Sequence, residues 1–203
     1  MEKIKEQNLA QLNVKQSLWD QVFTVAPLVV VGTREGEKYD LAPKHMVTPL
    51  GFGPYFGFVC TPRHSTFHNI KATGEFTVSF PKPDQLLFTS LSATPRNDSC
   101  SKSDLVLDAL PVAKALNMDV PVIEGAYLYL ECRSPKILDG FDDYAIITGE
   151  VVAAYADKEY ALGFERDQQD QLQKNPLLVY VAPGRFASIS QTFNFPFPKD
   201  FKR

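Results

Sequence analysis

The chain has 203 residues, of which 44% are hydrophobic and 22% charged, and its formal net charge is -3. This length and balance fit one globular domain spanning residues 1–203 and exclude a fibrous or disordered chain. The lysines and arginines are scattered and the net charge is slightly negative, so we expect no nucleic-acid partner.

The sequence predicts a cytoplasmic protein with no membrane span. Its longest apolar run, Val25 to Val31, is interrupted by Pro27 and is far shorter than the ~20 residues that cross a bilayer. The first residues are polar and lack an apolar stretch, so we expect no signal peptide. Cys60, Cys100 and Cys132 are widely spaced, which argues against a disulfide framework and against a cysteine zinc site.

The first fifty residues predict a helix followed by a β-hairpin. A polar segment with a few apolar side chains predicts a short amphipathic helix within residues 5–20. The β-branched residues from Val25 to Thr33 predict a strand, and Gly36 lies in a charged turn that favours chain reversal. Lys38 to Val47 is then the expected return strand.

The next segment predicts two strands around a polar loop and a short helix. Tyr55 to Cys60 and Phe76 to Phe80 are apolar runs typical of strands. Between them, Phe67 to Ala72 predicts about two helical turns, which Gly74 is placed to end. The loop before the helix is rich in hydroxyls and cations, and backbone N–H groups converge at such a helix start. This pattern indicates an anion site.

The second half predicts a long hairpin and a final strand. Residues 85–101 give no clear assignment, whereas Ser101 and Asp104 have the spacing of a capping box for a short helix that ends or kinks at Pro111. The later expected elements are a strand from Ile123 to Arg133, a turn from Asp139 to Asp143, a strand from Tyr144 to Tyr155 with a bulge at Gly149, a helical turn from Asp167 to Lys174, a strand from Leu177 to Ala182 and a Phe- and Pro-rich tail. Six or more strands with tight turns favour a mainly β fold, a closed or partly closed antiparallel barrel with short peripheral helices.

The polar loop carries groups suited to a phosphate monoester. Arg63 can donate two N–H groups to it, and the Ser65 and Thr66 hydroxyls and the helix dipole add to the attraction. These contacts offset only part of the ~4–15 kcal/mol cost of association, so a flat apolar ring must also bind, and Pro43, Met46 and Cys60 offer such a surface. The alternative is that Ser65 and Thr66 only cap a helix and that Arg63 is a solvated surface charge.

The order of these motifs resembles the flavin reductase-like, FMN-binding split-barrel family. The resemblance begins at Ala42 and Pro43, continues through the loop and helix from Thr61 to Ile70, and extends to Thr73-Gly74-Glu75-Phe76-Thr77-Val78. Pro121 to Cys132 is similar to the family's P-x-I-x-x-A-x-x-x-L-E-C strand, and Gly149-Glu150-Val151 to its G-E-V return strand. The resemblance covers roughly residues 22 to 155.

Membership would imply a six-stranded Greek-key split barrel, a homodimer, and FMN, or in some relatives FAD, bound near the dimer interface. On the ring side the resemblance implies Ala42, Pro43, Lys44, His45 and Met46, with Cys60 and Thr61 from the next strand. On the phosphate side it implies Arg63, Ser65, Thr66 and Asn69. The chain departs from the family pattern at two positions, because Asp40 stands where relatives commonly have Asn and His45 where they have Ser.

His45 is the candidate catalytic residue. It could donate a hydrogen bond to the flavin ring and stabilise reduced flavin, or it could be a partly exposed histidine bonded to backbone. Strand alternation puts Lys44 opposite His45, so at most one of them faces the ring. His64 and His68 are four residues apart, but a zinc site is disfavoured because no third ligand or glutamate base accompanies them.

The tail offers two interpretations. Tyr180 and Arg185, with Phe193 and Phe195 beyond, could lie over the flavin or a partner subunit, or could simply cover a barrel end.

The resulting functional hypothesis is an oxidoreductase that binds FMN and accepts hydride from NADH or NADPH. No G-x-G-x-x-G fingerprint is present, so the nicotinamide would bind transiently on the exposed flavin face. A second hypothesis is a flavin or electron carrier that serves a partner redox protein or oxygenase and has little turnover of its own. A third is a barrel that has lost flavin binding and acts as an interaction scaffold.

Overall fold

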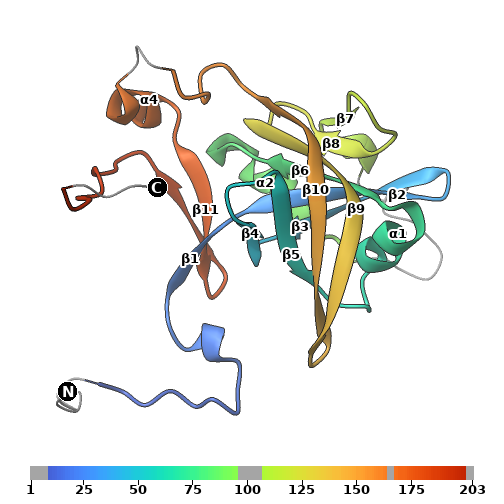
Figure 1. Cartoon of the computed structure of the whole chain (residues 1–203), viewed down its shortest axis with the longest axis horizontal. Helices are drawn as coiled ribbons and strands as arrows, with labels where there is room; N and C mark the ends of the chain where they lie inside the picture. The colour runs from blue at the N-terminus through green and yellow to red at the C-terminus, as the bar shows by residue number, and fades with distance from the viewer. Residues whose placement is uncertain (1–8, 96–106, 164–166, 200–203) are drawn as a thin grey trace.

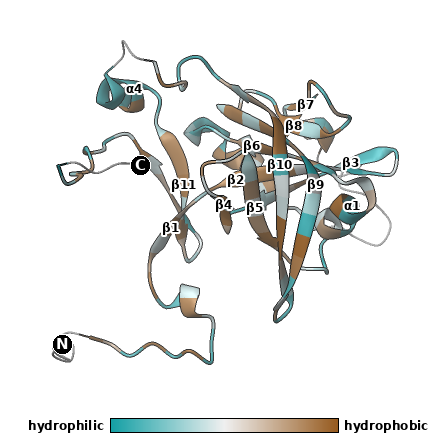
Figure 2. Cartoon of the chain, viewed as in Figure 1, coloured by the Kyte–Doolittle hydropathy of each residue, from teal (hydrophilic) through white to brown (hydrophobic). Residues whose placement is uncertain are grey.

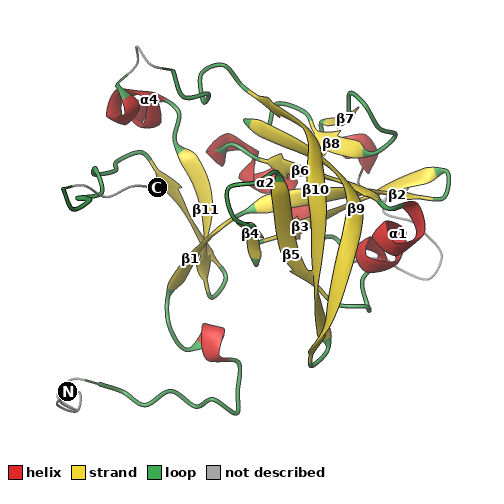
Figure 3. Ribbon diagram, in the orientation of Figure 1, coloured by secondary structure: helices red, strands yellow, loops and turns green. Residues whose placement is uncertain are grey.

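The computed structural model describes residues 9–95, 107–163 and 167–199. Antiparallel strands dominate it, and the helices are short (Figure 3). The main sheet has seven strands in the order β3-β2-β6-β9-β10-β5-β4. Their bounds are β2 (Val29–Glu35), β3 (Lys38–Lys44), β4 (Val47–Pro49), β5 (Tyr55–Cys60), β6 (Glu75–Phe80), β9 (Leu128–Phe141) and β10 (Tyr144–Ala156).

The main sheet curls on itself. Strands β3 and β4 are its two outermost strands, yet only His45 and Met46 separate them in the chain. Three residue steps reach about 11 Å at most, so the two edges of the sheet must approach each other. The predicted mainly β, open-barrel fold is therefore confirmed. The strand count differs, seven instead of six, because the expected strand Lys38 to Val47 breaks into β3 and β4.

Two smaller sheets accompany the barrel. The first has the order β1-β11-β12, and it lies beside the barrel with the N-terminal segment leading away from it (Figure 1). The second pairs β7 with β8. Their strands are β1 (Thr24–Pro27), β11 (Leu177–Ala182), β12 (Arg185–Ile189), β7 (Val112–Lys114) and β8 (Pro121–Ile123). The described helices are α1 (Ser65–Thr73), α2 (Leu86–Leu91) and α4 (Gln168–Lys174), with 3-10 turns η1 (Leu18–Asp20), η2 (Pro83–Gln85) and η3 (Leu107–Ala109).

The core is built on both faces of β2. Val29 and Val31 join the barrel-interior cluster, which includes Phe58 and Phe76, whereas Val30 joins a separate cluster with Leu41, Leu107, Leu110 and Ile123. All three valines are fully buried. A continuous β-branched run is what a strand covered on both faces requires.

Several local predictions are confirmed. The strands Tyr55–Cys60 and Leu177–Ala182 have the expected bounds. Gly74 ends α1 in the left-handed conformation with φ of 71°. The register of β9 against β10 shifts between Thr148 and Glu150, which confirms the bulge at Gly149. A β-carbon at Gly149 would lie 2.7 Å from two ring atoms of Phe76, so the position requires glycine.

Other local predictions are wrong. In the described part of the expected helix 5–20, residues 9–17 form no helix and the 3-10 turn η1 is the only helical turn, because side chains such as Trp19, 54% exposed, have no core to pack against. The expected strand Val25 to Thr33 divides at Leu28 into β1 and β2. The strand expected from Ile123 to Arg133 is interrupted where Gly125 adopts φ of 80°, and its second part, β9, continues to Phe141. The turn expected at Asp139 to Asp143 therefore tightens to Asp142 and Asp143.

The remaining differences concern the ends of two predicted segments. The chain does not stop pairing after β11, because β12 forms a hairpin with it. The helix expected to begin near Ser101 lies in residues 96–106, outside the described ranges, and residues 107–109 just beyond them form a 3-10 turn. Within the ranges that the structure describes, no helix combines the length and apolar character needed to cross a bilayer.

Candidate functional site

The site is organised around the end of β3. This strand pairs only with β2, so the backbone groups along its outer edge are not used by another strand of the described chain. Pro43 fits such an edge strand because it has no N–H to give to a ladder. Ala42 and Lys44 are buried, whereas Pro43 and His45 are half-buried. The strand therefore presents an apolar dipeptide to the space beside it.

A polar loop approaches β3 from the start of α1. The Arg63 backbone N–H donates to the Thr61 hydroxyl at 3.3 Å, and the His64 N–H donates to the Thr61 carbonyl at 3.0 Å. His64 is the N-cap residue of α1, but its side chain makes no capping hydrogen bond. The first turn of the helix thus faces this loop without a side-chain cap, which is the geometry that attracts an anion.

These two parts enclose a pocket of about 460 Å³, called here the β3–α1 pocket. Six residues for which the family resemblance implied flavin binding line it, namely Ala42, Pro43, Lys44, Arg63, Ser65 and Thr66. Its opposite wall comes from Ala93, Thr94 and Pro95, which follow α2. These three residues were not predicted, because residues 85–101 could not be assigned from the sequence.

The other predicted residues lie around this pocket and not in its lining. Cys60 is 2% exposed and lies behind Lys44, with its Sγ 3.7 Å from the lysine Nζ. Asn69 is also buried and donates to the Thr33 hydroxyl at 3.0 Å, which ties α1 to β2. Thr61 shapes the loop by accepting the two backbone hydrogen bonds from Arg63 and His64. Met46 is 45% exposed and lines neither this pocket nor the next.

The charges of the β3–α1 pocket favour an anion near its mouth. The Nζ of Lys44 lies 3.5 Å from Nδ1 of His64, and burial raises the pKa of the neighbouring Cys60 thiol, an effect that the lysine charge opposes. Arg63 lies at the mouth in an ion pair with Asp143, Nη2 to Oδ2 3.3 Å, and both side chains are largely exposed. Deeper in, the Thr66 hydroxyl donates to the buried Asp40 carboxylate at 3.3 Å.

A second pocket, of about 540 Å³, lies on the other side of Pro43 and is called here the α2–hairpin pocket. His45 forms part of it and stacks on Tyr180, with ring centroids 4.0 Å apart and planes at 21°. Burial, and then the charge of Lys44, lower the pKa of His45. The alternation predicted for Lys44 and His45 is thus observed, because the two side chains line different pockets.

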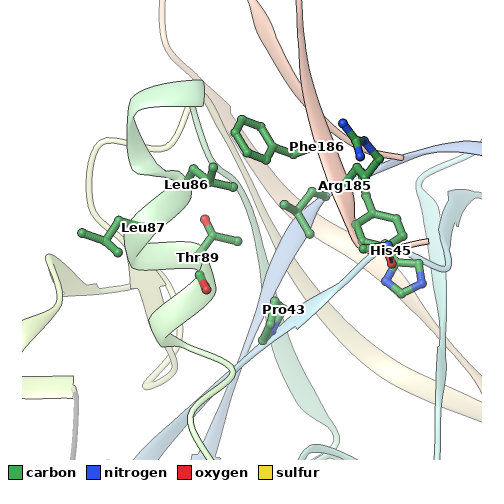
Figure 4. Close-up of a pocket in the computed structure, with 11 residues that line it drawn as sticks. Pro43, His45, Leu86, Leu87, Thr89, Arg185 and Phe186 are labelled. Atoms are coloured by element: carbon green, nitrogen blue, oxygen red, sulfur yellow. Dashed lines mark hydrogen bonds between the residues drawn. The ribbon is translucent and has the colours of Figure 1, made fainter. Parts of the chain in front are cut away.

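The remaining walls of the α2–hairpin pocket come from α2 and from the β11–β12 hairpin (Figure 4). Leu86 and Thr89 point into it from the helix, and Phe186 points toward them from β12 (Figure 4). The full lining is Leu28, Pro43, His45, Leu86, Leu87, Thr89, Ser90, Tyr180, Gly184, Arg185 and Phe186. Sequence reasoning had noted Tyr180 and Arg185 but missed α2, for which Pro83 in the preceding turn was the available signal.

The described residues contain no cluster of three or more His, Cys, Asp or Glu side chains that could hold a metal ion. His64 and His68 are both exposed.

Comparison with known proteins identifies the family and similar folds. The model of the flavin reductase like domain matches residues 23–182. The 2-nitrobenzoate 2-nitroreductase of Pseudomonas fluorescens is similar in structure, with a TM-score of 0.76, 19% identity and coverage of 97% of this chain and 99% of that one. An FMN-binding protein from Thermus thermophilus with bound p-hydroxybenzaldehyde has a TM-score of 0.69 and 20% identity, and the match covers 97% of this chain and 100% of that one. The NADH:FAD oxidoreductase of Streptomyces globisporus C-1027 has a TM-score of 0.68 and 17% identity, and the match covers 88% of this chain and 96% of that one.

Proposed function

The chain belongs to the flavin reductase-like family, and on this premise we propose that it is an oxidoreductase that binds FMN non-covalently and takes hydride from NADH or NADPH. The observation that carries this proposal is the β3–α1 pocket, where two cations and an uncapped helix start lie beside an apolar strand edge. The three similar structures are named for flavin binding, flavin reduction or nitro-group reduction, which supports the same class of activity.

The donors of the β3–α1 pocket fit a flavin phosphate. Arg63 at the mouth offers a planar fork of N–H donors, and Lys44 adds a second positive charge. The Ser65 hydroxyl and the first N–H groups of α1 complete a set that is typical of phosphate sites. Thr66 and Asn69 contribute less directly in our proposal, because their side chains already bond Asp40 and Thr33.

The ring would lie along Ala42 and Pro43. Ala42 and Pro43 line the β3–α1 pocket, and their two small apolar side chains allow a flat ring to approach the strand closely. When bound, a flavin supplies the two-electron chemistry, while the protein orients it and tunes its potential. Lys44 places a positive charge on this strand, where it favours negative charge that develops on a bound ligand.

His45 remains our candidate catalytic residue. Its lowered pKa keeps the imidazole neutral at pH 7, so it can donate one hydrogen bond and can stack, but it does not add a second charge. Its place across Pro43 from the β3–α1 pocket suits a role on the side of the ring where the donor and the acceptor take turns.

We also propose that the protein is a homodimer. The β1-β11-β12 sheet lies outside the barrel, yet β11 is brown along much of its length (Figure 2). In β1 and the segment that leads into it, Trp19, Phe23 and Val25 are 54%, 71% and 65% exposed. A second subunit would cover such apolar side chains. Light scattering on the purified protein measures the mass directly, and a monomer would refute this proposal.

The absorption spectrum of the purified protein, before and after FMN addition, tests flavin binding. We expect a flavin band and a rise of the melting temperature with FMN concentration. Anaerobic addition of NADH and NADPH should then bleach the band. Bleaching without steady NAD(P)H oxidation when free flavin is supplied would favour the carrier that serves a redox partner or oxygenase. A protein that neither carries nor binds FMN or FAD would be a scaffold.

A further inference from the structure

The α2–hairpin pocket has a composition that the binding of FMN does not explain. Apolar and aromatic side chains supply most of its walls, and Arg185 is the single permanently charged side chain in the part of the lining that the structure describes. No ion pair within the described residues engages Arg185. A cation with no counter-ion beside an apolar cavity is complementary to a ligand that is mostly apolar and carries one negative charge.

The aromatic side chains further define the shape of that ligand. His45 and Tyr180 form one stacked wall, and Phe186, 56% exposed, points across the cavity toward Leu86 (Figure 4). An aromatic ring on one side of the cavity and a leucine side chain on the other favour a ligand with a planar ring between them. Since the lowered pKa of His45 leaves it neutral at pH 7, the ligand meets one cation and not two.

The hairpin that carries Arg185 is held in position. The Tyr180 hydroxyl accepts a hydrogen bond from the Gly184 N–H at 2.7 Å, which closes the turn between β11 and β12. Arg185 and Phe186 are the first residues after this turn, and both pair with β11, opposite Val181 and Tyr180. Both residues therefore line the pocket from a braced strand end, Phe186 on the face of the hairpin that carries Tyr180 and the exposed Arg185 on the other face.

We propose that the α2–hairpin pocket binds a planar aromatic carboxylate, with its carboxylate on Arg185 and its ring between Phe186 and α2. Pro43 lines both pockets, so the ring of this ligand would lie next to the flavin. The role of this ligand as an electron acceptor rests on the proposed function. The volume of about 540 Å³ is within the range of small-molecule sites and accommodates one or two fused rings.

Calorimetric titration with 2-naphthoate, and with its neutral analogue 2-naphthamide, tests the proposal on the FMN-treated protein. We expect naphthoate to bind at least about tenfold more tightly than the amide, a difference of about 1.4 kcal/mol, because only the carboxylate forms a charge-assisted bond with Arg185. In Arg185→Gln this preference should disappear. Phe186→Ala should weaken both ligands by a similar factor, because it removes ring contact and no charge.

Two controls keep the outcome clear. Lys174→Gln removes a cation on α4, outside this pocket, and should leave the preference unchanged. FMN titration of the same samples separates the two proposals: if FMN binds but naphthoate does not, the aromatic-acid site is refuted and the flavin proposal stands. If naphthoate binds with the Arg185-dependent preference but FMN does not, the site is supported and the flavin proposal fails. Equal affinity for naphthoate and naphthamide in the unmodified protein, or a preference that survives Arg185→Gln, overturns the assignment of Arg185.

Discussion

Arg63→Gln is the most direct test of the proposed phosphate end of the proposed flavin site. In the structure, the guanidinium already has a partner, Asp143, at 3.3 Å, and the two side chains are 69% and 72% exposed. A phosphate at the mouth of the β3–α1 pocket must compete with this pair. An exposed ion pair contributes about 0.2–1 kcal/mol, whereas a hydrogen bond to a charged group contributes about 1.5–3 kcal/mol.

The difference sets the expected size of the effect. Exchanging the exposed pair for a phosphate contact yields about 1–2 kcal/mol, so Arg63→Gln should weaken FMN binding about five- to thirtyfold. Asp143→Asn removes the competitor and leaves the guanidinium in place, and it should strengthen FMN binding by up to about fivefold. The two variants therefore move the Kd in opposite directions.

The assay is quenching of flavin fluorescence on titration with each variant, using FMN and riboflavin in parallel. Riboflavin has the same ring and no phosphate, so its Kd should be the same in the unmodified protein and in Arg63→Gln. An equal loss for FMN and riboflavin would mean that Arg63 supports the fold or the ring and not the phosphate. An unchanged Kd for FMN in Arg63→Gln would refute the placement of the phosphate at this loop.

Three further predictions concern stability and reactivity. Gly149→Ala should lower the free energy of unfolding by about 1–3 kcal/mol in urea titration, because the new methyl would meet the Phe76 ring at 2.7 Å; full stability would show that the ring can move aside at no cost. Because the pKa of His45 is lowered from 6.5 in the folded state, the unfolded chain takes up the proton first as the pH falls, so stability should decrease below about pH 6.5, and His45→Gln should flatten this dependence; an identical pH profile in the variant would contradict the burial argument. Burial raises the pKa of Cys132 to about 12, so peptide mapping after iodoacetamide treatment at pH 8 should find Cys132 unmodified in the native protein and modified in urea; rapid native labelling would disprove its protection.

Local sequence signals predicted the elements that depend on neighbouring residues alone. The strand Tyr55–Cys60 and the helix end at Gly74 were predicted because an apolar run and a glycine suited to the left-handed conformation are signals confined to a few residues. The prediction of a helix within residues 5–20 was wrong because a helix also needs a surface to pack on. The segment has a suitable pattern, but the described part of the chain offers it no such surface.

The candidate site divides in the same way. The sequence predicted that Ala42 and Pro43 and the loop around Arg63 belong together, through the order of motifs, and that Lys44 and His45 face opposite sides, through strand alternation. It could not predict that Cys60 and Asn69 stand behind the pocket, because burial depends on what the rest of the chain places over a residue.

The class of fold, the family resemblance and the prediction of an anion-binding loop all follow from the amino-acid sequence, because each is encoded in a short segment or in the order of such segments. The folded structure was needed to see that Pro43 lies between two pockets and that Tyr180 and Arg185, some 140 residues later in the chain, share one of them with α2. The physical reason is that these contacts follow from how the curled sheet and the β11–β12 hairpin close in space, and a pairing over such a separation leaves no local pattern in the residues that make it.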